Sequence, residues 1–470
     1  MYRFRSIDSL INKYHELENQ EIYFAAPHEL NDPMEGFQDI FWKGDSIVWN
    51  NFIKNYVRSL EHAFGLVFLL QNDRKIEAKD ILVLSQPHRL ETLDNQKLIQ
   101  KIIGKVFENE FIKKLPDELS KRQHEIRRDE LIAYIETIHP FVLEAISDIY
   151  LERKFILKPF LNRNLKEFSE LIKKSGSIVE LTNKMEAENN KIGKFYTAIN
   201  QYSQQIRLMT KYNQSITVSS FNNLFLISEF PMMYLSQLEA SIHPEWYSAS
   251  FLLEHTNSAI WGHYGDGHKG VCLKYRVIEK ESELSINLNT EYGYSSGPIV
   301  GMIPHTFKKI DYSSKHVEID FFRSIARLNR MVLKMLWYSD ENDNLSVCGE
   351  HLYGKEVDEE WRKKYWNNYE NRLRVKLKEW EYEKEYRLTL SGDFIDYRER
   401  NSRKLKYDFN DLESIIFGIK TTDDDKLKIV RIVEQKCKEN NRKEFDFQQA
   451  YYSKDDGQIK TYKLNLLKFD

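Results

Sequence analysis

The sequence is poor in residues that form covalent or metal-based cross-links. Of its 470 residues only three are cysteines, namely Cys272, Cys348 and Cys437. They lie far apart, so the chain has no Cys-x-x-Cys pair of the kind found in zinc and redox sites. Disulfide-stabilised domains are rich in cysteine, and a reducing, cytoplasmic environment is therefore the simplest expectation.

Glycine, proline and long apolar runs are scarce as well. The 18 glycines and 10 prolines argue against long flexible linkers. The longest apolar run, residues 63–70, is too short to span a bilayer, and the first residues lack the apolar core of a signal peptide. We therefore expect no association with a membrane.

Neither sign of charge dominates the chain. The 69 basic and 72 acidic residues leave a net charge of -3, which gives no overall attraction to nucleic acids or anionic membranes. A hydrophobic content of 41% and a charged content of 30% are typical of a folded protein. The Gly-x-x-x-x-Gly-Lys-Ser/Thr phosphate loop is absent, which argues against a P-loop ATPase.

Hydrophobic periodicity divides the chain into three parts. Residues 1–45 carry short strand and turn signals, residues 46–214 have a helical period, and strand signals return in residues 215–470. A chain of this length exceeds the usual size of one hydrophobic core. We predict an α+β fold in which a mixed or antiparallel β core, built from both chain ends, carries residues 46–214 as a helical insertion.

Individual elements follow from the same patterns. A helix boundary is expected at Pro140, because proline lacks the backbone N–H that a helix interior needs. Helices are predicted at residues 98–107, 189–213, 321–337, 355–379 and 423–438. Strands are predicted at residues 21–25, 216–221, 246–251, 271–275, 385–390, 412–418, 445–452 and 462–469.

The run of residues 380–387, Trp-Glu-Tyr-Glu-Lys-Glu-Tyr-Arg, is the most informative segment. On a strand, Glu381, Glu383, Glu385 and Arg387 would share one face. Neighbouring carboxylates repel each other, so they require a cation, a ligand or open water. A solvated strand edge explains them most simply, because charged edges protect sheets from aggregation. A catalytic carboxylate pair is the alternative.

Several motifs together resemble the bacterial proteins that carry the domain of unknown function 2971. The resemblance covers residues 1–45 and 216–470 and leaves out the helical block, and the family name implies no activity. The matching segments are Tyr2–Ser6, Tyr23–Ala25, Asn31–Glu35, Ser250-Phe251, Ile260–Tyr264, His268–Leu273, Trp380 with Glu383–Arg387, and Ile415–Gly418.

A more distant resemblance suggests a chemistry. The chain is similar to ADP-ribosyltransferases that place an Arg on an early strand, a Ser-x-Ser on a middle strand and a Glu-x-Glu on a late strand. Arg3 or Arg5, then Ser248-Ala249-Ser250, then Glu383-Lys384-Glu385 occur in this order, and Ser219-Ser220 competes for the middle position. The resemblance implies an ADP-ribosyltransferase-like core, NAD as substrate and no metal.

Cleavage of the nicotinamide–ribose bond creates an oxocarbenium-like sugar, as in glycoside hydrolysis. A carboxylate beside that ribose stabilises the developing positive charge. We expect Glu385 to have this role and Glu383 to orient the acceptor or accept its proton. The expected NAD-binding residues are Arg3, Arg5, Ser248, Ser250, His263 and Tyr264, with an arginine bound to the pyrophosphate.

Two other hypotheses remain open. In the first, the protein is a non-catalytic sensor or interaction module, the carboxylates are structural, and residues 46–214 bind a protein or nucleic-acid partner. In the second, His263, Asp266 and His268 belong to a metal-dependent hydrolase, although no fourth ligand is evident nearby. The favoured hypothesis is an NAD-consuming enzyme with an unknown acceptor, in a bacterial defence or toxin context.

Overall fold

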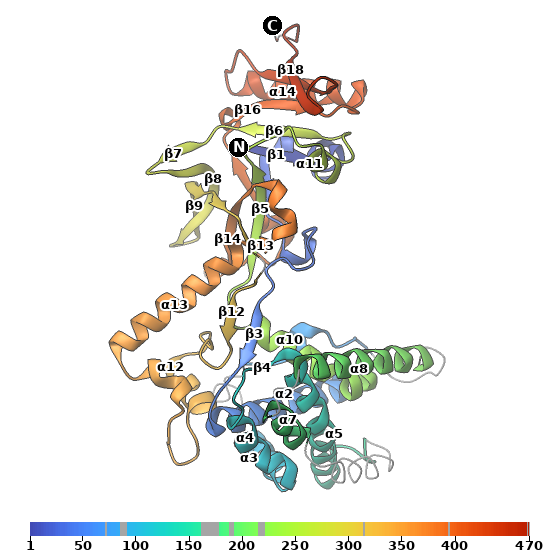
Figure 1. The fold of residues 1–470 in the computed structure, drawn as a ribbon, viewed down its shortest axis with the longest axis vertical. Helices are drawn as coiled ribbons and strands as arrows, with labels where there is room; N and C mark the ends of the chain where they lie inside the picture. The colour runs from blue at the N-terminus through green and yellow to red at the C-terminus, as the bar shows by residue number, and fades with distance from the viewer. Residues whose placement is uncertain are drawn as a thin grey trace. The chain divides into compact units, whose positions relative to one another are not determined.

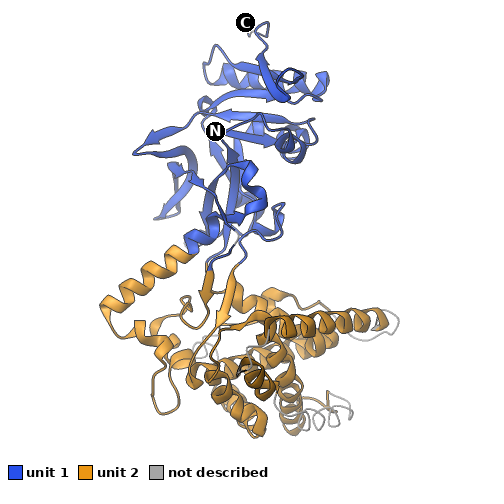
Figure 2. Cartoon of the chain, viewed as in Figure 1, with its two compact units in different colours: residues 1–37, 244–317, 369–470 blue, residues 38–243, 318–368 orange. Residues whose placement is uncertain are grey.

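In the computed structural model the chain folds into two compact units, each assembled from separated segments (Figure 2). Unit 1 comprises residues 1–37, 244–317 and 369–470, and unit 2 comprises residues 38–243 and 318–368. The structure describes residues 1–70, 73–84, 92–160, 178–187, 192–214, 221–313, 315–392, 395–467 and 469. The architecture is α+β with mixed sheets, as the sequence predicts.

Unit 1 is organised around an eight-stranded sheet with the order β10-β14-β5-β1-β6-β16-β17-β18 (Figure 1). Neighbouring strands are antiparallel except β16 and β17, which are parallel, so the sheet is mixed. Its strands are β1 (Tyr2–Arg5), β5 (Trp246–Leu252), β6 (Val271–Tyr275), β10 (Lys308–Lys309), β14 (Glu385–Ser391), β16 (Leu412–Phe417), β17 (Asp446–Ser453) and β18 (Gln458–Lys463).

A second, antiparallel sheet in unit 1 has the order β2-β15-β8-β7, and β9 pairs with β8. Its strands are β2 (Glu21–Tyr23), β7 (Ile278–Lys280), β8 (Glu283–Tyr294), β9 (Pro298–Thr306) and β15 (Lys404–Tyr407). The remaining elements are the parallel pair β11 (Asp311–Ser313) and β13 (Val375–Leu377), with helices α1 (Glu16–Asn19), α11 (Ser258–His263) and α14 (Asp423–Glu439).

Strand β14 separates the apolar core from the charged residues. Leu388 and Leu390 point to the face that packs in the main hydrophobic cluster of unit 1. Glu385 and Arg387 alternate with them and therefore lie on the opposite face. The strand thus carries core residues and candidate site residues within one short segment.

Unit 2 is largely helical. Helices α2 and α5 contribute many of its buried residues, including Trp49 and Tyr134, and a small sheet has the order β12-β3-β4. Its elements are β3 (Asp39–Trp42), α2 (Ser46–Leu70), α3 (Leu93–Phe107), α4 (Glu110–Ser120), β4 (Ile126–Arg127), α5 (Arg128–Glu152), α7 (Ile178–Ala187), α8 (Ile192–Gln214), α9 (Phe221–Leu224), α10 (Phe230–Ala240), β12 (Glu318–Asp320) and α12 (Arg330–Leu333), and α13 (Lys355–Arg374) continues into unit 1.

Unit 2 extends beyond the predicted insertion of residues 46–214, since it also includes residues 38–45, 215–243 and 318–368. The predicted strand 216–221 and the competing Ser219-Ser220 lie outside the described residues, except that Phe221 begins α9. Within the described part of the chain, no helix combines the length and the apolar character needed to cross a bilayer.

Three helix predictions were wrong in part, one of them because the predicted helix 355–379 ends at Arg374, where strand β13 follows. Pro140 lies inside α5 rather than at its boundary, because the buried Ile138 and Phe141 on either side hold that turn in the core. The predicted helix 321–337 begins only at Arg330. Asn329 starts it by accepting a hydrogen bond from the backbone of Val332, whereas the preceding apolar residues are buried without helical structure.

Helix α14 begins at a residue that the sequence identifies as its cap. The Thr422 side chain accepts a hydrogen bond from the backbone N–H of Asp425 at 3.2 Å, and three aspartates occupy the first turn. We expect Thr422→Ala to lower the free energy of unfolding by about 1 kcal/mol, because this N–H loses its acceptor. Urea unfolding measures the loss. Thr422→Ser keeps the acceptor and should cost less, and equal losses in both variants would contradict the capping role.

Candidate functional site

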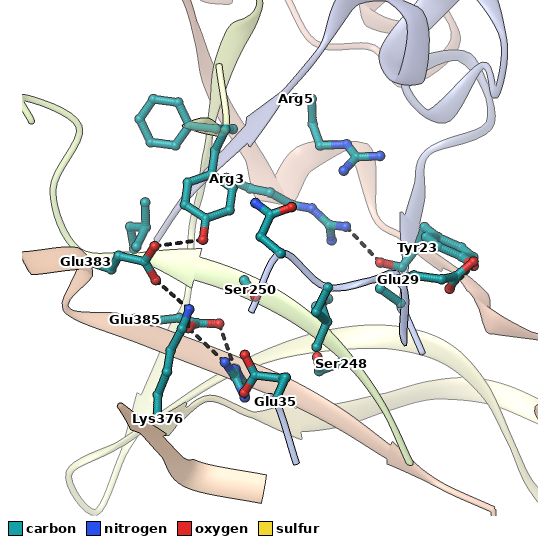
Figure 3. Close-up of a pocket in the computed structure, with 18 of the residues that line it drawn as sticks. Arg3, Arg5, Tyr23, Glu29, Glu35, Ser248, Ser250, Lys376, Glu383 and Glu385 are labelled. Carbon is teal, nitrogen blue, oxygen red and sulfur yellow. Dashed lines mark hydrogen bonds and ion pairs between the residues drawn. The ribbon is translucent and has the colours of Figure 1, made fainter. Parts of the chain in front are cut away.

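A pocket opens in unit 1 beside the junction of β1 and β5. These strands pair at a single position, Tyr2 opposite Leu252, and Ala25 instead forms the bridge to Ser248. The cavity has a volume of about 190 Å³ and is lined by residues from all three segments of unit 1 (Figure 3). The polar lining residues are Arg3, Arg5, Tyr23, Glu29, Asn31, Glu35, Ser248, Ser250, Tyr264, Lys376, Glu383, Glu385 and Arg387.

The sheet order brings the three predicted motifs together. Strand β14 with Glu385 lies beside β5 with Ser248 and Ser250, and β5 lies beside β1 with Arg3 and Arg5. In the β5–β14 register Ser250 is opposite Arg387. All the predicted site residues except His263 line this one pocket.

The segment before β14 is not the continuous strand that the sequence suggests. Residues 378–383 form a 3-10 helix, and Lys384 has a left-handed backbone with φ of 49°. The strand begins at Glu385. Glu381 is consequently exposed instead of sharing a face with the other two glutamates, whereas Glu383 is buried and still lines the pocket.

A buried ion-pair network fills one end of the pocket (Figure 3). The Arg387 guanidinium donates two hydrogen bonds to Glu385, at 2.7 and 2.9 Å, and a third to Glu35 at 2.5 Å. The Lys376 ammonium lies 2.7 Å from Glu383 Oε2 and 3.1 Å from Glu385 Oε2. Three carboxylates therefore face two cations, all in positions closed to bulk water.

This network fixes the protonation state of Glu385. Burial alone would raise the pKa of its carboxyl, but Arg387, Lys376 and Ser250 outweigh burial and hold the pKa at about 2. Burial likewise disfavours the charged form of Lys376, yet Glu385 and Glu383 raise the pKa of the ammonium above its usual value. At neutral pH the pocket thus contains an ionised carboxylate and a protonated lysine in direct contact.

Outside the ion-pair network, basic and hydroxyl side chains line the pocket. Arg3 donates from Nη2 to the Tyr23 carbonyl at 2.7 Å, while burial lowers the pKa of its guanidinium to about 10. Its Nη1 and the Ser248 hydroxyl are buried and have no hydrogen-bond partner among the described residues. Buried polar atoms are usually paired, so these two lack a partner that such atoms normally have. Arg5 is already engaged, since its Nε donates to Glu16 at 2.7 Å.

Of the two predicted NAD-binding residues Tyr264 and His263, only Tyr264 lines the pocket. The Tyr264 hydroxyl donates to Glu383 Oε1 at 2.7 Å and lines the pocket. His263 ends helix α11 with an exposed side chain that lies outside the lining. Adjacent residues on a helix point in different directions, which explains why only one of them reaches the site.

The loop after α11 is a tight turn and gives no support to a metal site. Asp266, Gly267 and His268 all have positive φ values, which residues of tight turns commonly adopt. Among the described residues no three His, Cys, Asp or Glu side chains are grouped so that they could hold a metal ion. His263, Asp266 and His268 therefore do not form the centre that the hydrolase hypothesis needs.

Two glycine spacings match known motifs in the wrong structural context. Gly265, Gly267 and Gly270 have the Gly-x-Gly-x-x-Gly spacing, but they follow a helix and precede strand β6, the reverse of a dinucleotide fingerprint. Gly293 and Gly297 frame a Gly-x-Ser-x-Gly sequence at the β8–β9 turn rather than at a strand-to-helix elbow.

Sequence reasoning missed Lys376 and Glu35 as site residues. Lys376 falls within the predicted helix 355–379, yet it lies on the short strand β13. The alternation Val375-Lys376-Leu377 is the only local signal for that strand. Glu35 follows a turn at Asn31-Asp32-Pro33, in which Asp32 accepts a hydrogen bond from the backbone of Met34. Nothing in the local sequence indicates that Glu35 pairs with Arg387.

Comparison with known proteins supports one of the resemblances. Residues 260–388 match the family described as "Protein of unknown function (DUF2971)". The match contains the Trp261–Tyr264 and Glu383–Arg387 motifs and ends within β14. No curated protein and no solved structure matches the chain.

Proposed function

We propose that unit 1 binds NAD in this pocket and cleaves its nicotinamide–ribose bond, either to transfer ADP-ribose or to hydrolyse NAD. One observation carries the proposal: the neighbouring strands β14, β5 and β1 bring Glu385, Ser250 and Arg3 to a single pocket. The order of the three motifs along the sequence does not by itself require their strands to be neighbours in the sheet. An arginine, a serine pair and a glutamate on adjacent strands are the arrangement that this chemistry uses.

The charges of the pocket suit the two parts of the substrate. The nicotinamide ribose becomes positively charged as its bond breaks, and Glu385 and Glu383 provide fixed negative charge. Arg3, with an unpaired Nη1, and the Ser248 hydroxyl suit the pyrophosphate. A cavity of roughly 150 Å³ holds a benzene molecule. The 190 Å³ here therefore encloses one ring-sized part of NAD, and the rest would extend outside.

The proposed reaction needs no metal, and its acceptor is a protein, a nucleic acid, a small molecule or water. All three cysteines are free and buried, which fits the cytoplasmic location that we propose. A role as a bacterial toxin or defence effector rests on family resemblance alone.

Nicotinamide release from NAD by the purified chain tests the proposal. We expect Glu385→Gln to reduce release by about 10²–10³-fold, because the carboxylate that stabilises the transition state loses its charge. Glu381→Gln is the matched control, since it changes an exposed glutamate of the same segment. Full activity of Glu385→Gln, or a wild-type chain that neither binds nor consumes NAD, would refute the proposal.

One observation favours the interaction-module alternative. Arg387 and Lys376 already pair with both oxygens of Glu385, as in a structural ion-pair network. Under this alternative residues 46–214 bind a partner and NAD is not consumed. A wild-type chain that does not bind NAD, yet retains a partner through a surface of unit 2, would establish it.

A further inference from the structure

The geometry points to a cation subsite, formed by Glu383, Glu385 and the ring of Trp380, that Lys376 occupies as an internal substitute for a ligand. A positively charged group of the ligand must displace Lys376 to enter, so this lysine restrains the site. The inference rests on the proposed function for the identity of that ligand, whose nicotinamide ring is cationic.

The surroundings of the Lys376 ammonium are those of a bound cation. It contacts Glu383 Oε2 at 2.7 Å and Glu385 Oε2 at 3.1 Å, and it lies 4.7 Å from the centroid of the Trp380 ring. Figure 3 shows the side chain reaching up to the two carboxylates. Carboxylates combined with an aromatic face form the usual binding site for organic cations.

The two carboxylates are held independently of Lys376. Arg387 binds Glu385 through two hydrogen bonds, and the Tyr264 hydroxyl donates to Glu383. Both glutamates therefore keep a fixing partner when the ammonium leaves. Arg387 in turn pairs with Glu35, so three carboxylates would then face one guanidinium. The carboxylates would then outnumber the cations around them by two, which favours a cationic replacement.

The segment that carries Lys376 is held by few backbone contacts. Strand β13 comprises Val375–Leu377 and pairs with β11 at three positions in a two-stranded sheet. Glu385, by contrast, starts a strand that pairs with β5 along its whole length. Small local sheets open at a lower free-energy cost than central strands. Lys376 thus lies on a more easily moved element than Glu385.

Lys376→Ala tests the subsite with probes that need no enzymatic activity. We expect n-butylammonium and 1-methylnicotinamide, both cations, to raise the melting temperature of this variant in a saturable manner, whereas neutral n-butanol does not. Lys384→Asn is the matched control. It removes the neighbouring, exposed ammonium that pairs with Glu254, and asparagine tolerates the left-handed backbone there. Failure of both cations to stabilise Lys376→Ala would overturn the inference.

A measurement on the wild-type chain covers the case in which Lys376→Ala does not fold. Lys376 is buried and protonated and should resist acetylation by an amine-reactive reagent. Increasing 1-methylnicotinamide should raise its acetylation at least severalfold, as read by mass spectrometry, and leave Lys384 unchanged. Acetylation of Lys376 that does not respond to the probe would contradict displacement.

Turnover of NAD separates the inference from the proposed function. A restraining lysine predicts that Lys376→Ala releases nicotinamide about tenfold faster at subsaturating NAD, with n-butylammonium as a competitive inhibitor. Slower release that n-butylammonium restores would overturn the restraint and make Lys376 a positioning residue. If no variant consumes NAD, the proposed function fails, while the thermal and acetylation measurements still decide whether the cation subsite exists.

Discussion

Replacing Arg387 by Met is expected to lower the free energy of unfolding of unit 1 by about 3–5 kcal/mol. The Arg387 side chain is fully buried and forms ion pairs with Glu385 and Glu35. Methionine has a comparable apolar stem but no charge, so buried Glu35 would lose its ion-pair partner and buried Glu385 would keep only Lys376. Urea unfolding read by hydrogen exchange at the β5 and β14 amides measures the effect within unit 1.

A triple variant and an exposed ion pair provide the controls. Combining Arg387→Met with Glu35→Gln and Glu385→Gln removes the uncompensated charges and should restore much of the lost stability. Lys274→Ala breaks the Lys274–Glu413 pair, whose side chains are about one-third exposed, and should cost less than about 1 kcal/mol. A similarly small loss for Arg387→Met would show that the buried network is not a major source of stability.

Acid is expected to destabilise unit 1 through Glu385. Its pKa is about 2 in the folded chain, against an ordinary value of 4.5. As the pH falls below 4.5 the unfolded chain takes up a proton that the folded chain does not bind, so unfolding becomes more favourable. The stabilisation is complete above pH 4.5, is lost as the pH falls towards 2, and amounts to about 3 kcal/mol.

The difference between wild type and Glu385→Gln isolates this contribution from that of other carboxyl groups. Unfolding free energies at pH 7, 5 and 3 should converge between the two proteins as the pH falls, because glutamine does not titrate. Parallel pH dependences would mean that Glu385 does not have a depressed pKa in the folded chain.

Strands β5 and β6, whose residues are nearly all buried, were predicted closely. Several other strands were missed, among them β3 and β15, in which alternate residues are buried. The predicted strands 246–251 and 271–275 correspond to β5 and β6, whose apolar residues pack in the core. The hairpin of β8 and β9 was not predicted, because much of β9 and the end of β8 are exposed and lack the apolar alternation. The predicted strand 462–469 was wrong in its position, since β18 spans Gln458–Lys463.

The site was predictable where a motif is local and unpredictable where tertiary pairing creates it. Ser248-Ala249-Ser250 and Glu383-Lys384-Glu385 are recognisable as short motifs, and the fold places both serines and both glutamates in the pocket. Lys376 reaches them only because β13 pairs with β11. That pairing joins residues more than 60 positions apart, and no pattern within either segment specifies it.

Because unit 1 is assembled from three separated segments, its pocket residues are synthesised at widely different times. Arg3 is made first, Ser250 follows much later, and Glu385 and Arg387 emerge later still, although all four line one pocket. At about 5–20 residues per second, the ribosome needs roughly 20–80 s to pass from the first of these residues to the last. During much of this time strand β1 has no strand to pair with, because β5 and β6 have not yet been synthesised. Chains that end between Ser250 and Glu383 consequently contain the arginine and serine motifs without Glu383 and Glu385. The complete pocket forms only in chains synthesised beyond β14.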